Sequence, residues 1–210
     1  IVNSIWGKVI WFENIGSKGA PKLAESKPVQ IDWEGDPKTP EWYWWEPEPG
    51  AFVTQWRTTP YTTDWDGDGL TDLVMLDHEG YLSFFERAEE DGELTLQPGK
   101  RIFRNEDGSA LRLNEERVGG SGRRKLTLTD WDQDGDRDLL VNSTNATLYR
   151  NMGGEGEEVQ FVQEGTVADR ELAGHSTSPT TVDWNEDDVP DLLIGGEDGH
   201  FYYLQNPASK

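Results

Sequence analysis

A short acidic segment occurs three times in this chain, and each copy runs directly into an apolar stretch that is typical of a buried strand. The copies are DWDGDGLTDLVML from Asp64, DWDQDGDRDLLVN from Asp130 and DWNEDDVPDLLIG from Asp183. Their first residues lie 66 and 53 positions apart. This internal repeat constrains the fold more than any other feature, because each copy must form the same small unit and bury its apolar face against the next.

The sequence around the acidic segments also repeats. Eight residues beyond the last aspartate of each copy stands a small residue, namely Gly80, Ala146 or Gly199, and an aromatic stretch follows it. Each unit is therefore predicted to run strand, acidic turn, strand, small-residue turn, strand. The spacing is that of a propeller blade or a solenoid unit. Since no stretch shows a sustained helical period, we expect an all-β chain.

The composition fits a folded, turn-rich protein and excludes several classes. The formal net charge of −22 would repel a phosphate backbone, which excludes a non-specific nucleic-acid binder. The chain has no cysteine, so disulfides, thiolate zinc sites and a cysteine nucleophile are excluded. No apolar run approaches the length of a membrane span. Ten Trp, six Tyr and seven Phe argue against disorder, because disordered acidic chains contain few aromatic residues.

Each acidic segment places oxygen donors at the spacing of a cation-binding turn. Side-chain oxygens stand at positions 1, 3, 5 and 9, and position 7 offers its backbone carbonyl. Hard oxygen ligands on a flexible turn favour Ca²⁺ over Mg²⁺. The predicted ligands are Asp64, Asp66, Asp68, Leu70 and Asp72 in the first turn, Asp130, Asp132, Asp134, Asp136 and Asp138 in the second, and Asp183, Asn185, Asp187, Val189 and Asp191 in the third.

Electrostatics favours a bound cation in these turns. Unit charges 4 Å apart repel by about 1 kcal/mol even in bulk water, so clustered carboxylates require protons or a cation. The alternative is a solvated, Asp-rich turn that is capped by its own side chains. We expect Ca²⁺ at the first two turns. The third turn is a weaker candidate, because Asp188 replaces the glycine that stands at position 6 of the others.

These segments, in these surroundings, resemble the FG-GAP/VCBS repeats of integrin-type β-propellers and of many secreted bacterial proteins. The resemblance rests on the DWDGDGLTDLVM and DWDQDGDRDLLV runs, on FENIG at 12–16 and on YRNMGG at 149–154, and it covers most of the chain. It implies a propeller of about seven blades with Ca²⁺ in turns at one face. This chain would supply three full blades and part of a fourth. The resemblance also implies an extracellular or cell-surface location.

The repeat pattern divides the chain into five segments. Val2-Asn3-Ser4 matches Val141-Asn142-Ser143, so the chain is expected to begin inside a repeat. A bare strand edge invites aggregation, so the expected partner is the remainder of the propeller or another copy of the chain. The predicted segments are a partial blade at 1–31, a Trp-rich insertion at 32–52, blades with a Ca²⁺ turn at 53–120 and 121–172, and a C-terminal blade with a weaker turn at 173–207.

Ligands of propellers usually bind over the central channel, which is lined by the segment before each innermost strand. Basic and aromatic residues gather in these segments, namely Trp56, Arg57, Arg123, Arg124 and His175. In so acidic a protein a basic mouth would attract an anionic glycan, and Trp56 could stack on a sugar ring. The alternative is that the arginines form solvated turns or pair with aspartates, and that His175 is an ordinary turn histidine.

Two functions fit these features. The first is a secreted, non-catalytic, calcium-binding propeller that binds a glycan or a protein partner. The second is a polysaccharide lyase or glycoside hydrolase acting on an acidic polysaccharide, with His175 as the candidate base and an arginine that neutralises the substrate carboxylate. No nucleophile elbow, HExxH, P-loop or dinucleotide fingerprint indicates another activity. A third interpretation is a structural fragment that needs its other half.

Overall fold

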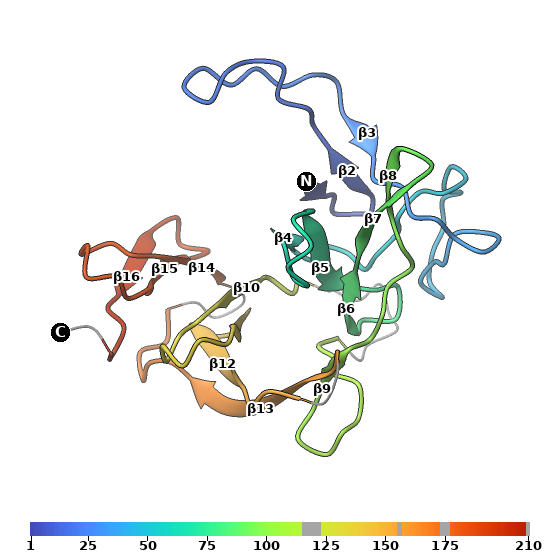
Figure 1. Ribbon diagram of the computed structural model, residues 1–210. Coiled ribbons are helices and arrows are strands. Elements are labelled where there is room, and N and C mark those ends of the chain that lie inside the picture. Colours follow the sequence, from blue (N-terminus) through green and yellow to red (C-terminus); the bar gives the residue numbers. More distant parts are fainter. Residues whose placement is uncertain (115–122, 155–156, 173–176, 209–210) are drawn as a thin grey trace. The chain divides into compact units, whose positions relative to one another are not determined.

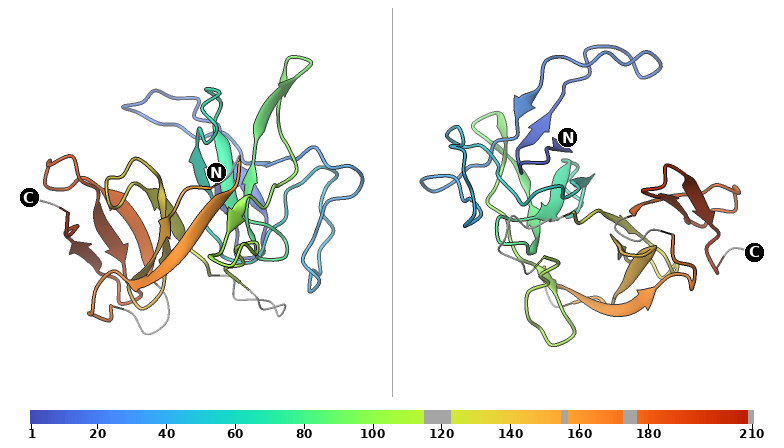
Figure 2. Two further views of the ribbon diagram at one scale, coloured as in Figure 1. Left: turned by 60° about the horizontal axis from the view of Figure 1, so that its bottom comes forward. Right: turned by 180° about the vertical axis from the view of Figure 1, so that it is seen from behind.

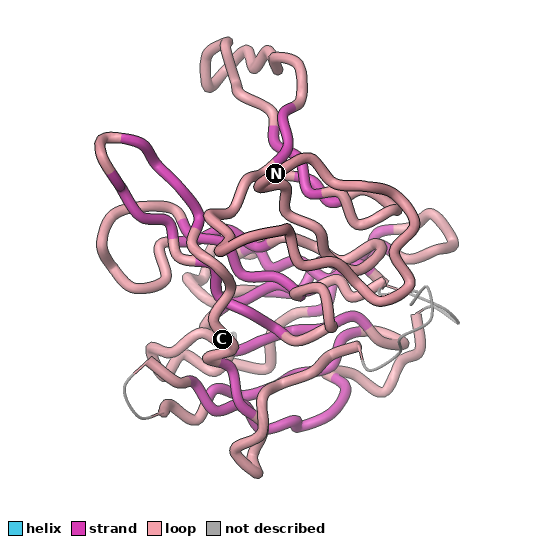
Figure 3. Tube along the Cα trace, turned by 90° about the vertical axis from the view of Figure 1, so that its right-hand side faces the viewer, coloured by secondary structure: helices cyan, strands magenta, loops and turns pink. Residues whose placement is uncertain are grey.

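The protein is an all-β chain, and its described residues form no helix (Figure 3). The computed structural model describes residues 1–114, 123–154, 157–172 and 177–208. They form two compact units, the first made of Ile1–Arg101 with Arg112–Arg123 and the second of Ile102–Leu111 with Arg124–Lys210. The predicted fold class is therefore confirmed at the level of all-β structure.

The first unit contains two small antiparallel sheets and a hairpin (Figure 1). The hairpin extends away from the second sheet, as the green ribbon shows in Figure 2. The first sheet is β1 (Val2–Asn3), β2 (Val9–Trp11) and β3 (Lys27–Pro28), the second is β4 (Tyr61–Thr63), β5 (Asp72–Leu76) and β6 (Leu82–Phe85), and the hairpin is β7 (Arg87–Glu90) with β8 (Glu93–Leu96).

The second unit contains two further sheets. The larger has the order β10-β11-β12-β13-β9 and is antiparallel except for the parallel pair of β13 with β9. The smaller has the order β14-β15-β16. The strands are β9 (Phe103–Arg104), β10 (Leu126–Thr129), β11 (Asp138–Asn142), β12 (Ala146–Asn151), β13 (Val159–Thr166), β14 (Ser178–Val182), β15 (Asp191–Gly195) and β16 (Phe201–Leu204).

The predicted order of elements is confirmed in all three repeats. Each acidic segment joins two antiparallel strands, namely β4 with β5, β10 with β11 and β14 with β15. The last aspartate of each segment is the first residue of the second strand. A third antiparallel strand, β6, β12 or β16, then follows.

The small-residue turn after the second strand is confirmed in two of the three repeats. Gly80 and Gly199 adopt φ values of +88° and +85°, a conformation that side chains disfavour. Gly7, in the N-terminal half repeat, adopts φ +78°. Its N–H donates to the Ser4 carbonyl at 3.2 Å, as the N–H of Gly80 does to a carbonyl three residues earlier. The half repeat therefore makes the same turn.

The second repeat differs from this prediction. Ala146 is not a turn residue but the first residue of β12, where it is buried and pairs with Asn142. The hairpin between β11 and β12 has two residues fewer than its counterparts, so an alignment counted from the last aspartate places Ala146 two positions too early. An L residue can occupy this place because it needs no positive φ.

Each unit has its own apolar core. The central strands β5 and β11 are buried along their whole length, because both of their faces are covered. In the first unit the cluster is Val9, Val29, Ile31, Phe52, Leu73, Met75 and Phe85. In the second unit it is Trp131, Leu140, Ala146, Leu148, Leu172, Leu192 and Ile194. In each unit the cluster takes residues from two successive sheets, which is how propeller blades pack.

The architecture is consistent with a partial β-propeller. Each repeat supplies a small antiparallel sheet, and apolar side chains join successive sheets within a unit. The number of blades and the predicted segment boundaries remain predictions. The described part of the stretch 88–122 holds most of the β7–β8 hairpin and β9.

Candidate functional site

The three acidic turns share one pattern of hydrogen bonds. The carboxylate at position 1 accepts a hydrogen bond from the backbone N–H at position 6, with N···O distances of 3.1 Å in the first turn, 3.1 Å in the second and 3.0 Å in the third. The carboxylate at position 5 accepts from the N–H at position 7, at 2.7, 2.9 and 3.0 Å. The side chain at position 3 accepts from the N–H at position 5, at 3.1, 3.3 and 3.2 Å.

The backbone bends where these hydrogen bonds form. Position 6 has a positive φ in each turn, +90° at Gly69, +101° at Gly135 and +66° at Asp188. Position 4 is also left-handed, with φ between +61° and +80° at Gly67, Gln133 and Glu186. Asp is among the residues that tolerate this region, so the third turn keeps the bend without glycine.

The aspartate at position 9 has a different role from the others. Asp72, Asp138 and Asp191 are buried, and each accepts a backbone N–H from a residue at the end of the third strand or two residues beyond it. The donors are Arg87 at 2.8 Å, Asn151 at 2.8 Å and Asn206 at 2.9 Å. In the first two turns the second carboxylate oxygen accepts the N–H of Trp65 or Trp131. The third turn uses the Tyr203 hydroxyl instead, at 2.9 Å.

The carboxylates of the first two turns crowd together. Among the described residues, Asp64, Asp66 and Asp72 bring one oxygen each within 4.8 Å of one another, and so do Asp130, Asp132 and Asp134. Burial raises the pKa of Asp72, and the charges of Asp66 and Asp68 raise it further. The two backbone N–H groups that donate to Asp72 lower its pKa, but they do not cancel the rise. Burial and neighbouring aspartates raise the pKa of Asp138 in the same way. A divalent cation would offset this repulsion.

The second turn passes a direct test of fit for a hard cation. Oδ1 of Asp130 is buried and meets no hydrogen-bond donor in the described part of the chain. A buried carboxylate oxygen without a partner is costly, and a metal ion is one of the groups that satisfies it. The predicted ligand atoms of this turn are all oxygens, as Ca²⁺ requires. Arg150, which sequence reasoning missed, supplies part of the countercharge through a 2.7 Å ion pair with Asp132.

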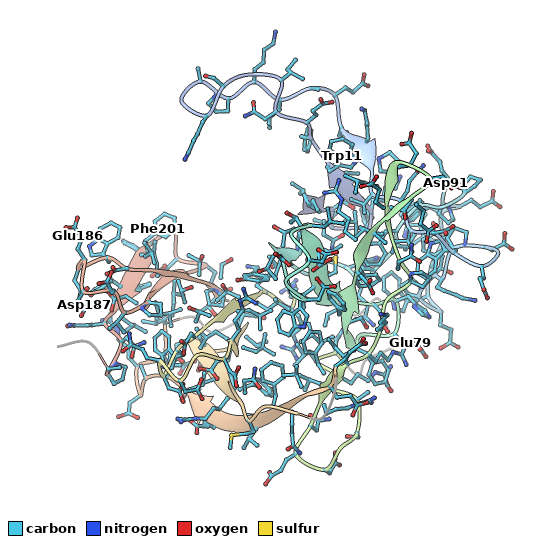
Figure 4. The ribbon with its side chains drawn as sticks, in the orientation of Figure 1. Trp11, Glu79, Asp91, Glu186, Asp187 and Phe201 are labelled. Carbon is cyan, nitrogen blue, oxygen red and sulfur yellow. The ribbon has the colours of Figure 1, made fainter. Side chains whose placement is uncertain are left out.

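The third turn has the same backbone but a poorer set of ligands. Asn185 replaces a carboxylate, and its amide lies 3.1 Å from Asp187 Oδ2. Figure 4 shows Glu186 and Asp187 at the outer end of this turn, beyond the strands. The second acidic turn lies close to the third within the same unit, because the Gln133 side chain of the second turn donates to the Asp188 carbonyl of the third at 3.3 Å.

The residues predicted for the channel mouth are only partly described. Trp56 is half-buried and Arg57 is exposed at φ +59°. The N–H of Arg123 donates to the Trp56 carbonyl at 3.0 Å, which places these two residues together. Arg124 belongs to the other unit. His175 lies outside the described residues, so its predicted catalytic role stays a prediction.

Sequence reasoning missed an aromatic cluster around Trp56. The ring of Trp6 lies 5.2 Å from that of Trp56 and 5.5 Å from that of Trp44, and both pairs meet edge to face. Trp42 meets Trp56 at 4.9 Å. The run of Trp in the insertion was the available signal, but nothing local to Trp6 links it to residues almost forty positions away.

The comparison with protein families supports the repeat. Residues 130–194 match the model of the FG-GAP-like repeat. The match begins at the first aspartate of the second acidic turn and ends in β15, so it includes two of the three turns. The resemblance to FG-GAP repeats is therefore confirmed over this segment. No curated protein matches the chain. The fold and this match define an all-β protein that carries an FG-GAP-like repeat.

Proposed function

We propose that the chain is a calcium-stabilised, β-propeller-like module of an extracellular or cell-surface protein, and that it binds a glycan. The observation that supports calcium most strongly is the common hydrogen-bond pattern of the three acidic turns. In all three, backbone N–H groups hold the carboxylates at positions 1 and 5 in place. In the second turn one buried Asp130 oxygen has no donor among the described residues.

An extracellular location agrees with both the repeat and the chemistry of the turns. FG-GAP repeats are typically extracellular, and extracellular modules bind Ca²⁺ with modest affinities of about 10⁻⁴ to 10⁻³ M. Within the described ranges, no helix is long and apolar enough to cross a membrane. Exposed turns with several water-accessible oxygens suit that range of affinity.

Glycan binding is favoured over a purely structural role because tryptophans gather at one place on the first unit. Trp6 and Trp44 are exposed, although buried tryptophan would contribute more to stability. The catalytic alternative, a lyase or hydrolase acting on an acidic polysaccharide, needs a base such as His175. Incubation with such polysaccharides, followed at the ultraviolet absorbance of an unsaturated product, tests that alternative. We expect no product.

Thermal melting tests the calcium proposal. A ligand that binds only the folded state raises the free energy of unfolding by RT ln(1 + [L]/Kd), which is about 2.7 kcal/mol when the ligand concentration is a hundredfold above Kd. Melting should therefore occur at a higher temperature in CaCl₂ than in EDTA, and equimolar MgCl₂ should restore little of the difference. An identical melting temperature in EDTA and in CaCl₂ would remove the proposal.

A further inference from the structure

Four tryptophans of the first unit form a continuous chain of rings, which we call the tryptophan patch. Trp44 contacts Trp6, Trp6 contacts Trp56 and Trp56 contacts Trp42, with ring centroids 5.5, 5.2 and 4.9 Å apart and nearly perpendicular planes. Trp56 is the half-buried support in the middle. Trp44, which is 64% exposed, and Trp6, which is 42% exposed, present their rings to solvent. The patch is therefore a built surface and not a set of scattered rings.

The insertion, which contributes Trp42 and Trp44 to the patch, is held in place by contacts of its own. The Trp45 indole N–H donates to the Trp6 carbonyl at 3.2 Å, and the Lys8 ammonium lies 4.3 Å from the centre of the Trp45 ring. The N–H of Tyr43 donates to the Pro40 carbonyl at 3.1 Å. Four prolines in the same loop restrict its backbone. A surface fixed in this way loses little entropy when a ligand binds.

A polar hollow of about 280 Å³ adjoins the patch at Trp42. Its lining includes Glu41, His78, Glu79 and Arg112. The Arg112 guanidinium already donates to the Glu79 carbonyl at 2.9 Å, and Glu79 also pairs with Arg101. The lining holds two carboxylates, Glu41 and Glu79, and one guanidinium, Arg112, so it offers both donors and acceptors without an excess of positive charge. Such a lining suits hydroxyl groups better than it suits a carboxylate or a phosphate.

Charge and area together decide which occupant fits best. Residues 32–50 contain six acidic residues and one lysine, so the insertion itself disfavours an anionic ligand. A protein interface needs roughly 800 Å² from each partner. The two exposed rings provide on the order of 200 Å², given that a whole aromatic side chain buries about 150–250 Å². That area matches the faces of a few sugar rings.

We propose that the tryptophan patch and the adjoining hollow bind an uncharged glycan, with one pyranose ring stacked on Trp44 and the hydroxyls of another in the hollow beside Trp42. This inference rests on the proposed glycan-binding function and assigns it a site and a ligand class. It centres the site on the exposed rings and the insertion instead of on the predicted basic residues Arg57 and Arg123, which adjoin Trp56. Trp56, predicted as a stacking residue, supports the exposed rings instead.

Calorimetric titration in CaCl₂ tests the inference with four hexasaccharide probes. Cellohexaose, xylohexaose and laminarihexaose are uncharged, and hexagalacturonate is the charged counterpart. We expect at least one uncharged probe to bind and hexagalacturonate not to. Trp44→Ala should weaken binding at least about tenfold, and Trp44→Phe should recover part of the loss. Trp184→Ala is the matched control, since Trp184 is also 64% exposed but lies in the second unit, and it should leave binding unchanged.

The outcomes separate this inference from the function on which it rests. Binding that survives Trp44→Ala overturns the site and leaves glycan binding in place. Preferential binding of hexagalacturonate overturns the ligand class. Absence of heat with all four probes overturns both, while calcium-dependent melting of the same sample would leave the calcium proposal intact. A change of oligomeric state in Trp44→Ala, seen by light scattering without glycan binding, would identify the patch as a protein interface.

Discussion

Gly80 and Gly199 stand at equivalent places in the repeat, but the space around their Cα atoms differs. Gly80 and Gly199 have almost the same φ, +88° and +85°. A Cβ on Gly80 would lie 2.1 Å from the Asn114 carbonyl oxygen, whereas a Cβ on Gly199 would meet nothing within 4 Å. The N–H groups of Leu113 and Asn114 donate to the Gly80 carbonyl. Glycine at position 80 therefore permits a close approach of two backbones as well as a left-handed turn.

Substitution of the two glycines separates these two effects. Gly199→Ala should cost about 1–2 kcal/mol, the penalty of an L residue in the left-handed region. Gly80→Ala should cost at least ~1–3 kcal/mol more, because the backbone of Asn114 must move away. Urea denaturation of both variants measures the difference in the free energy of unfolding. Equal losses would show that the contact with Asn114 contributes nothing.

Trp side chains at position 2 of the acidic segments illustrate how far residue-level reasoning reaches. They are expected to pack between sheets more often than to bind a ligand. Trp131 is buried in the core of the second unit, and Trp65 is half-buried, with its ring centroid 6.4 Å from that of Phe84. Trp184, which also follows the first aspartate of its segment, is exposed. Burial depends on what lies opposite a side chain, which its own sequence context does not encode.

At the scale of the element, each acidic turn combines two kinds of carboxylate. Those at positions 1, 3 and 5, with Asn185 in place of a carboxylate at position 3 of the third turn, shape the loop and leave oxygens available, as Asp130 shows. The carboxylate at position 9 is buried and ties the turn to the end of the third strand or to the residues just beyond it, as Asp138 does by accepting the backbone N–H groups of Trp131, in the turn, and Asn151, in β12. The first kind should matter through the cation, and the second through the fold itself.

Melting of two variants in CaCl₂ and in EDTA distinguishes these roles. Asp130→Asn keeps an acceptor for the Gly135 N–H but weakens the metal site, so it should lower the melting temperature in CaCl₂ and have little effect in EDTA. Asp138→Asn places an NH₂ group against a backbone N–H, so it should cost about 1–3 kcal/mol in both solutions. Asp107→Asn, an exposed change of equal charge, is the control. A calcium-independent loss in Asp130→Asn would contradict the assigned role.

The elements that the sequence predicts well are those with a local signal. Acidic turns and their flanking strands carry a nine-residue pattern and an apolar run, so all three are found where they are expected. The parallel pairing of β13 with β9 has no such signal. Val159 pairs with Phe103 across more than fifty residues, and this pairing depends on tertiary packing. The displaced Ala146 shows that even a good repeat leaves a two-residue ambiguity.

At the scale of the whole molecule, composition indicates chemistry better than it indicates a binding site. The net charge of −22 and the clustered aspartates are by themselves enough to favour a divalent cation. The proposed glycan site has no such compositional signal, because Trp6 and Trp56 meet only after the first unit folds. The predicted basic mouth rested on sequence neighbours of the strands. The aromatic contacts of the first unit favour the insertion instead.

The central claim is that the acidic turns are calcium sites, and calorimetric titration of metal-free protein with CaCl₂ tests it most directly. The account predicts saturable binding with at least two sites per chain, and loss of two of them in the double variant Asp64→Asn/Asp130→Asn. Magnesium should compete weakly, because it prefers a stricter octahedron and its own waters. Absence of saturable calcium binding at millimolar concentration, or binding that the double variant retains in full, would contradict the account.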